Sequence, residues 1–186
     1  MHIIGITGTL GAGKGEVVDC LKKAGFVHFS AREFLFEEMG RRGLERNRDN
    51  INFVGEDLRR THSASYIMES LFARAEKEGK NCIIESVRAM GEVEFLKKQK
   101  NFTLLAVDAD PALRYERVVK RKSELDRVTF EKFLADEKRE SVSKNPAQMN
   151  LPDCIALADY TLMNNGTKEE LGEKVEEVLR EILKDK

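Results

Sequence analysis

The stretch HIIGITGTLGAGKG at residues 2–15 joins a short β-branched run to a glycine-rich turn. The run at 2–7 predicts a buried strand, and residues 16–21 have the composition of a helix start. The spacing G-x-x-x-x-G-K between them fits a phosphate-binding loop, because glycines let backbone N–H groups turn inward around a polyphosphate. Lys14 then supplies a mobile charge for the β- and γ-phosphates. The alternative is a glycine-rich turn that binds nothing.

Gly15 departs from the full pattern of such loops, which place there a Ser or Thr whose hydroxyl meets Mg²⁺. We therefore expect Mg²⁺ to be held by phosphates, water and an acidic side chain from elsewhere in the chain. The candidate ATP-binding residues of this stretch are Gly8, Leu10, Gly11, Ala12, Gly13, Lys14, Gly15 and Glu16.

The composition limits the possible partners. The 32 basic and 33 acidic residues give a net charge of −1, so no basic excess indicates nucleic-acid binding. No apolar run approaches membrane-spanning length, and no signal peptide precedes the first strand, which predicts a cytoplasmic protein without a membrane partner. The three scattered cysteines and three histidines lack metal-ligand spacing and are expected to be structural.

Strands and helices alternate along the chain. Five apolar runs predict strands at 2–7, 26–29, 82–84, 102–107 and 159–163. This order predicts an α/β domain over residues 1–186, with a doubly wound five-stranded parallel sheet and helices on both faces. A helical insertion is expected at about 30–78 and a short lid at about 117–130, whereas 143–153 reads as irregular. Ligands should bind beyond the carboxyl ends of the strands.

Glu85 and Arg88 follow the third predicted strand. A carboxylate at the end of a buried strand needs a metal, water or a cation nearby, so Glu85 is expected to orient Mg²⁺ through water or to accept a proton from the acceptor. The alternative is that Glu85 pairs with Lys14 or an arginine without metal. Arg88 can clamp a phosphate bidentately, although it also fits a surface loop.

Further arginines fall where an acceptor and ATP would bind. Arg32 and Arg59 lie in the helical insertion and are candidates for binding the acceptor, together with Arg127. Arg117 and Arg121 lie four residues apart on one helix, where like charges repel unless an anion bridges them, which favours a lid over ATP against a plain basic surface. Asp108 follows a strand but also fits helix capping, so it is a weaker metal candidate than Glu85.

The chain resembles the P-loop nucleotide kinases, among them adenylate and other nucleoside monophosphate kinases and dephospho-coenzyme A kinase. The resemblance runs nearly end to end and rests on 8–15, 30–35, 83–88, Arg117 with Arg121, and 158–167. It implies a P-loop NTPase fold, with a nucleoside-monophosphate-binding insertion and a lid. It also implies ATP and Mg²⁺ as cofactors, with Lys14, Glu85, Arg88, Arg117 and Arg121 as catalytic residues. Asn165 and Gly166 should lie near the adenine.

The acceptor stays open at this level. Gly-Lys-Gly resembles the loop of monophosphate kinases, whereas Asn-Asn-Gly-Thr at 164–167 resembles dephospho-coenzyme A kinases. The leading expectation is phosphorylation of a nucleoside or deoxynucleoside monophosphate by a monomer or homodimer. The alternatives are dephospho-coenzyme A kinase, or a regulatory P-loop ATPase without a small-molecule acceptor.

Overall fold

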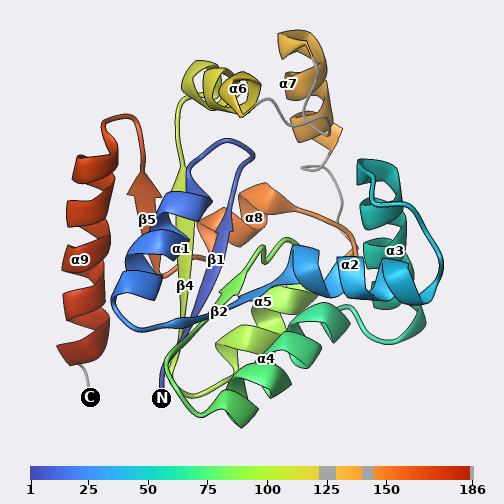
Figure 1. Ribbon diagram of the computed structural model, residues 1–186, viewed down its shortest axis with the longest axis horizontal. Coiled ribbons are helices and arrows are strands. Elements are labelled where there is room, and N and C mark those ends of the chain that lie inside the picture. The colour runs from blue at the N-terminus through green and yellow to red at the C-terminus, as the bar shows by residue number, and fades with distance from the viewer. Residues whose placement is uncertain (122–128, 140–144, 185–186) are drawn as a thin grey trace.

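The protein folds around a five-stranded parallel sheet (Figure 1). A computed structural model describes residues 1–121, 129–139 and 145–184. The strands are β1 (Ile3–Gly8), β2 (Val27–Ser30), β3 (Cys82–Glu85), β4 (Phe102–Asp108) and β5 (Tyr160–Met163). Their order in the sheet is β2-β3-β1-β4-β5, and every pairing is parallel. This arrangement confirms the predicted fold class.

The composition of β1 suits the centre of the sheet. All six residues of β1 are buried, and β-branched isoleucines suit a strand covered on both faces. Ile6 pairs with Glu85 of β3 on one side and with Leu105 of β4 on the other. The loop after β1 therefore leaves the middle of the sheet at its carboxyl edge, where the strand order reverses and ligands of such sheets bind.

Helices cover both faces of the sheet. One core packs against α2 (Ala31–Arg41), α3 (Arg48–Thr61), α4 (Tyr66–Glu78), α5 (Met90–Lys97) and α8 (Leu151–Ala156). The other packs against α1 (Lys14–Lys23) and α9 (Lys168–Lys184), which lie side by side in Figure 1. Apolar side chains at helical spacing face the sheet in both cores, which is the pattern that the sequence showed.

Three helices between β2 and β3 form the predicted insertion. The hydroxyl of Ser30 accepts a hydrogen bond from the Glu33 amide at the start of α2, and Asn47 caps α3 in the same way. These caps fix where α2 and α3 begin. α2 starts directly after β2, and α3 stands at the right of the molecule in Figure 1.

Two segments lie above the carboxyl edge of the sheet, α6 (Pro111–Lys120) and α7 (Phe130–Arg139). Tyr115 of α6 packs against the rings of Phe130 and Phe133 on α7. The lid predicted at 117–130 includes the end of α6, while its central residues 122–128 lie outside the described residues.

One local prediction is wrong in its last three residues. Residues 143–153 were expected to be irregular; 143–144 lie outside the described residues and 145–150 belong to no helix or strand, but Leu151–Ala156 form the short helix α8. Pro152 lies in its first turn, where a missing N–H leaves no helical bond unmade, and the side chain of Asn150 caps Asp153. Proline was therefore a start signal rather than a sign of irregular chain.

None of the helices in the described residues has both the length and the apolar character needed to span a membrane.

Candidate functional site

The loop after β1 is shaped by glycines, two of which adopt a left-handed backbone conformation. Gly11 has φ +81°, and a Cβ there would lie 2.4 Å from the backbone oxygen of Arg114. Gly13 has φ +103° and forms the left-handed cap of α1. Gly15 differs, because a Cβ at that position would meet nothing within 4 Å. The backbone thus turns tightly at Gly11 and Gly13, and it leaves the side of Gly15 open.

Lys14 folds back over the loop. Its Nζ donates hydrogen bonds to the carbonyl oxygens of Gly8 (2.8 Å) and Thr9 (2.7 Å). Burial, followed by the positive charge of Arg88, lowers the pKa of Lys14 to about 7 from 10.5. The Glu85 carboxylate acts against this shift. Near neutral pH the Lys14 amine is therefore only partly protonated, and a bound anion would favour its charged form.

Glu85 ends β3, and its partner is His28 of β2. The Glu85 Oε2 atom lies 3.0 Å from Nε2 of His28, and both side chains are about one-fifth exposed (20% and 21%). Burial raises the pKa of Glu85. The hydrogen bond and charge of His28, together with the charge of Lys14, lower the pKa by more than burial raises it. The net pKa lies below the ordinary value, so Glu85 is an ionised carboxylate beside the loop.

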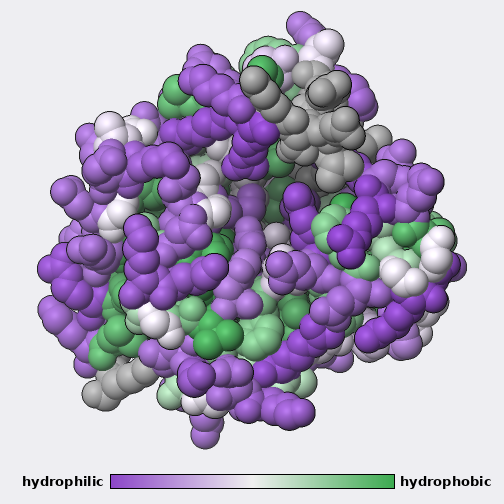
Figure 2. All heavy atoms as spheres, viewed as in Figure 1, coloured by the Kyte–Doolittle hydropathy of each residue, from purple (hydrophilic) through white to green (hydrophobic). Residues whose placement is uncertain are grey.

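One cleft opens between the loop and the insertion helices; we call it the insertion cleft. Of the predicted residues it brings together Gly8 and Leu10 of the loop with Arg32, Arg59 and Arg88. Its other lining residues are Ala31, Leu35, Arg48, Ile51, Asn52, Gly55, Glu56, Ser86, Met149 and Leu151. Four arginines therefore face a partly apolar space next to the glycine loop. Figure 2 shows this face of the molecule hollowed near its centre and mostly hydrophilic around the hollow.

Arg59 is held within the insertion cleft by a buried carboxylate. Its Nε donates to Oε1 of Glu92 at 2.8 Å, and the two side chains are 6% and 0% exposed. Glu92 also accepts hydrogen bonds from the backbone amides of Arg88 and Ala89. Sequence reasoning singled out Arg59 but not Glu92.

A second cleft lies on the other side of the loop, between α6 and the turn after β5; we call it the α6 cleft. It brings together the predicted residues Gly13, Gly15, Glu16, Arg117, Arg121 and Gly166, with Asn164 and Lys168. One nitrogen of Arg117, Nη1, is buried and has no hydrogen-bond partner among the described residues. A buried guanidinium nitrogen without a partner is a donor that an anion can satisfy.

Asn164 rather than Asn165 contacts the loop. The Asn164 side chain is buried and donates to the Ala12 carbonyl oxygen at 2.8 Å. Asn165 instead accepts a hydrogen bond from the Asp110 amide and does not line the α6 cleft. Ala12 is itself buried, so its side chain is not presented to a ligand in either cleft. The turn after β5 thus supports the loop as well as lining the cleft.

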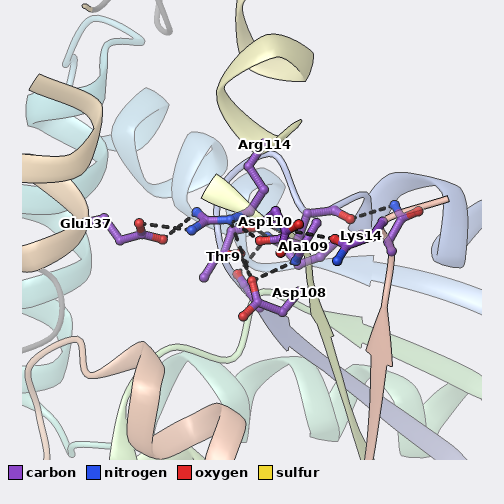
Figure 3. A network of polar contacts seen from close by, with 11 residues as sticks. Thr9, Lys14, Asp108, Ala109, Asp110, Arg114 and Glu137 are labelled. Carbon is purple, nitrogen blue, oxygen red and sulfur yellow. Dashed lines mark hydrogen bonds and ion pairs between the residues drawn. The ribbon is translucent and has the colours of Figure 1, made fainter. Parts of the chain in front are cut away.

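Asp108 joins the loop to α6 (Figure 3). Its Oδ1 accepts hydrogen bonds from the Thr9 hydroxyl at 2.6 Å and from the Ala109 amide at 2.9 Å. Arg114 donates to the Ala109 carbonyl and pairs with Glu137 of α7. Asp108 is therefore engaged with the loop hydroxyl, which goes beyond the helix-capping alternative.

Arg127 lies outside the described residues. Within the described residues no group of three or more His, Cys, Asp or Glu side chains is placed to hold a metal ion. His28 was expected to be structural. It lies beside the Glu85 carboxylate because its strand, β2, pairs with β3 in a register that places Ser30 opposite Glu85.

The sequence matches one family model and relatives that extend over nearly the whole chain. A model described as an AAA domain matches residues 4–142. A UPF0200 protein of Sulfurisphaera tokodaii is 34% identical over 185 residues, covering 98% of each chain. The chain belongs to the UPF0200 family. The family's extent matches the whole fold described above, from β1 to α9.

Solved kinase structures share the fold of this UPF0200 chain. Shikimate kinase from Acinetobacter baumannii has a TM-score of 0.56 at 16% identity, covering 100% of this chain and 95% of its own. Dephospho-CoA kinase from Campylobacter jejuni has a TM-score of 0.53 at 14% identity and covers 97% of both chains. At these identities the likeness establishes a P-loop kinase-like fold.

Proposed function

We propose that the protein is an ATP- and Mg²⁺-dependent phosphotransferase that phosphorylates a nucleoside or deoxynucleoside monophosphate to the diphosphate. The observation that carries the proposal is the pair of arginine-lined clefts on opposite sides of one glycine loop. Phosphoryl transfer needs a donor and an acceptor in line, with positive charge around the moving group. One cleft per substrate, meeting at the loop, supplies that arrangement.

ATP fits the α6 cleft. The amides of the loop and the start of α1 can bind its phosphates, and Lys14 can leave the carbonyl oxygens of Gly8 and Thr9 for the β- and γ-phosphates. The unpartnered Nη1 of Arg117 supports an anion at this position. Arg121 lies in the same cleft and adds charge near the phosphates. Gly166 lines this cleft and stays a candidate for the adenine end, whereas Asn165 lies outside it and is bound to the Asp110 amide.

The acceptor fits the insertion cleft. Arg32, Arg59 and Arg88 can bind its phosphate there, and the apolar side chains of Leu35 and Ile51 offer a surface for a base. The terminal phosphoryl group of ATP moves to a phosphate oxygen of the acceptor, and ADP is the leaving group. A phosphate acceptor is already ionised, so this reaction requires no general base.

The two carboxylates near the loop suit Mg²⁺ binding if most of the metal's ligands come from ATP and water. Glu85 and Asp108 are carboxylates at the ends of β3 and β4, on either side of the loop, and Gly15 contributes no hydroxyl. When bound, Mg²⁺ would neutralise charge on the phosphates and align them. Glu85, with its lowered pKa, is the first candidate to orient its water ligands.

A hydroxyl acceptor, as in dephospho-coenzyme A, is the second candidate, and the contact between His28 and Glu85 favours it. A hydroxyl must lose its proton as the phosphoryl group arrives, and an oriented carboxylate can accept that proton. Replacing Glu85 by Gln should then lower kcat by about 100-fold or more with the hydroxyl acceptor. Equal and mild losses with both acceptor types would exclude the proton-accepting role.

The test is ADP release from ATP and Mg²⁺ with ribo- and deoxyribonucleoside monophosphates and dephospho-coenzyme A, using Lys14→Ala as the control. Turnover with one monophosphate supports the proposal and names the acceptor. Turnover only with dephospho-coenzyme A supports the second candidate. Turnover of ATP without an acceptor would indicate a regulatory ATPase and would overturn both.

A further inference from the structure

Among the described residues that form ion pairs, Glu92 is the one whose carboxylate side chain is completely buried. It accepts three hydrogen bonds: from Nε of Arg59 at 2.8 Å and from the backbone amides of Arg88 (2.8 Å) and Ala89 (3.1 Å). One side chain therefore joins α3 of the insertion to the segment between β3 and α5.

The two residues that Glu92 holds also line the insertion cleft. Arg59 reaches the cleft from α3 and Arg88 from the end of β3. The Nε of Arg59 is bound to Glu92, which restricts the guanidinium group and leaves its two terminal nitrogens out of this bond, in a residue that lines the cleft. An arginine fixed in this way is prepared for bidentate binding of a phosphate.

Stability alone does not account for this arrangement. Removing two charges from water costs about as much as their attraction returns, and apolar replacements of buried ion pairs are often as stable. Glu92 also caps the amides at the start of α5, but a neutral amide oxygen could do that. What the carboxylate adds is its second oxygen, which orients Arg59.

We propose that Glu92 is a positioning residue for the acceptor, which sets Arg59 and Arg88 at one spacing so that together they bind the acceptor's phosphate. The proposal rests on the proposed function in placing the acceptor in the insertion cleft. Glu92 does not touch the acceptor itself. It determines how two arginines from separate segments are presented.

Glu92→Gln separates positioning from capping. The glutamine oxygen can still accept from the amides of Arg88 and Ala89, but its NH₂ group then faces the N–H of Arg59 and cannot accept from it. The KM for the acceptor should rise by about tenfold or more, while the KM for ATP changes less than twofold. Glu37→Gln is the matched control, since Glu37 pairs with Arg74 away from both clefts, and it should change neither KM.

A second variant guards against a folding defect. Glu92→Asp keeps the buried charge but is one methylene shorter, so it cannot span both the amides and Arg59, and its acceptor KM should rise in the same direction. Circular dichroism and urea unfolding identify the folded variants. A folded Glu92→Gln or Glu92→Asp protein with an unchanged acceptor KM would overturn the proposal.

A readout independent of catalysis separates this inference from the proposed function. Inorganic phosphate serves as the probe, and its binding is followed through the Nε–H resonance of Arg59 in an NMR titration of the whole chain. We expect phosphate to shift this resonance in the natural protein and to bind about tenfold more weakly to Glu92→Gln. If no acceptor supports turnover, this result still upholds the role of Glu92. Equal phosphate affinity in both proteins, or no shift in the natural protein, would overturn it.

Discussion

Lys14 has a pKa of about 7, so under the proposed function the binding of ATP should depend on pH. A bound triphosphate restores the ammonium charge, so the protein should take up about 0.9 proton per ATP at pH 8 and much less at pH 6. Calorimetry in buffers with different ionisation enthalpies measures this number. Lys14→Ala should remove the uptake at pH 8, and the same uptake in both proteins would contradict the assignment.

The same shift has a defined effect on the stability of the ligand-free protein. Between about pH 7 and 10.5 the unfolded chain carries a proton on Lys14 that the folded chain lacks. The unfolded state then binds more protons, so the contribution of Lys14 to the free energy of unfolding rises with pH across this window. Comparing urea unfolding of the natural protein and Lys14→Ala at pH 7 and pH 9 isolates that contribution.

Arg117 carries a buried nitrogen without a partner, so the ligand-free protein holds it at a cost. Arg117→Met keeps an unbranched apolar stem and removes the guanidinium donors. The variant should gain roughly 1 kcal/mol in free energy of unfolding without ligand and bind ATP about tenfold more weakly. Urea unfolding and calorimetric titration give the two quantities. A loss of stability together with unchanged ATP affinity would show that Arg117 serves the fold.

At the scale of the element, the glycine loop contains two kinds of glycine. Gly15→Ala adds a methyl group to open space within α1 and should stabilise the protein by about 0.4–1 kcal/mol. Gly11→Ala places its methyl group against the Arg114 backbone at φ +81° and should destabilise it by roughly 1–3 kcal/mol or more. Urea unfolding with an unchanged m-value tests the pair, and similar effects of both would contradict the described geometry.

At the scale of the whole molecule, the two clefts should respond separately to substitution. Arg32 lines the insertion cleft and Arg121 the α6 cleft, so each should affect one substrate. We expect Arg32→Ala to raise the acceptor KM, and Arg121→Ala the ATP KM, by about tenfold each. Steady-state kinetics with each substrate varied in turn measures the split. If both variants raised the same KM, the two substrates would share one cleft.

The fold was predictable because its signals are local. The β-branched run of β1, the capping side chains Ser30 and Thr167, and the Pro111 helix start each act within a few residues. Thr167 and Glu170 exchange reciprocal hydrogen bonds at the start of the last helix, which is the capping-box pattern that a Thr followed three residues later by a Glu indicates. α8 was missed because its proline also fits irregular chain.

The partners within the site were not predictable, because they join residues far apart in sequence. Glu85 was expected to face a metal or a cation, and its partner His28 comes from another strand, 57 positions away. Glu92 lies 33 positions from Arg59, and a lone glutamate in a helical stretch reads as a solvated charge. Only the sheet order and the packing of α3 on α5's N-terminal segment place these groups together.

β2 and β3 are neighbours in the sheet, and Ser30 pairs with Glu85 where both strands end. The helices between them thus form one continuous block whose two ends are anchored side by side, while the loop, α6 and the β5 turn belong to other parts of the chain. Under the proposed function, lineages could remodel this block, which supplies most of the residues that line the insertion cleft, while the residues that line the α6 cleft stay unchanged. Such changes would fall in one contiguous stretch of gene, and the contribution of Ser86 and Arg88 to the same cleft would stay fixed.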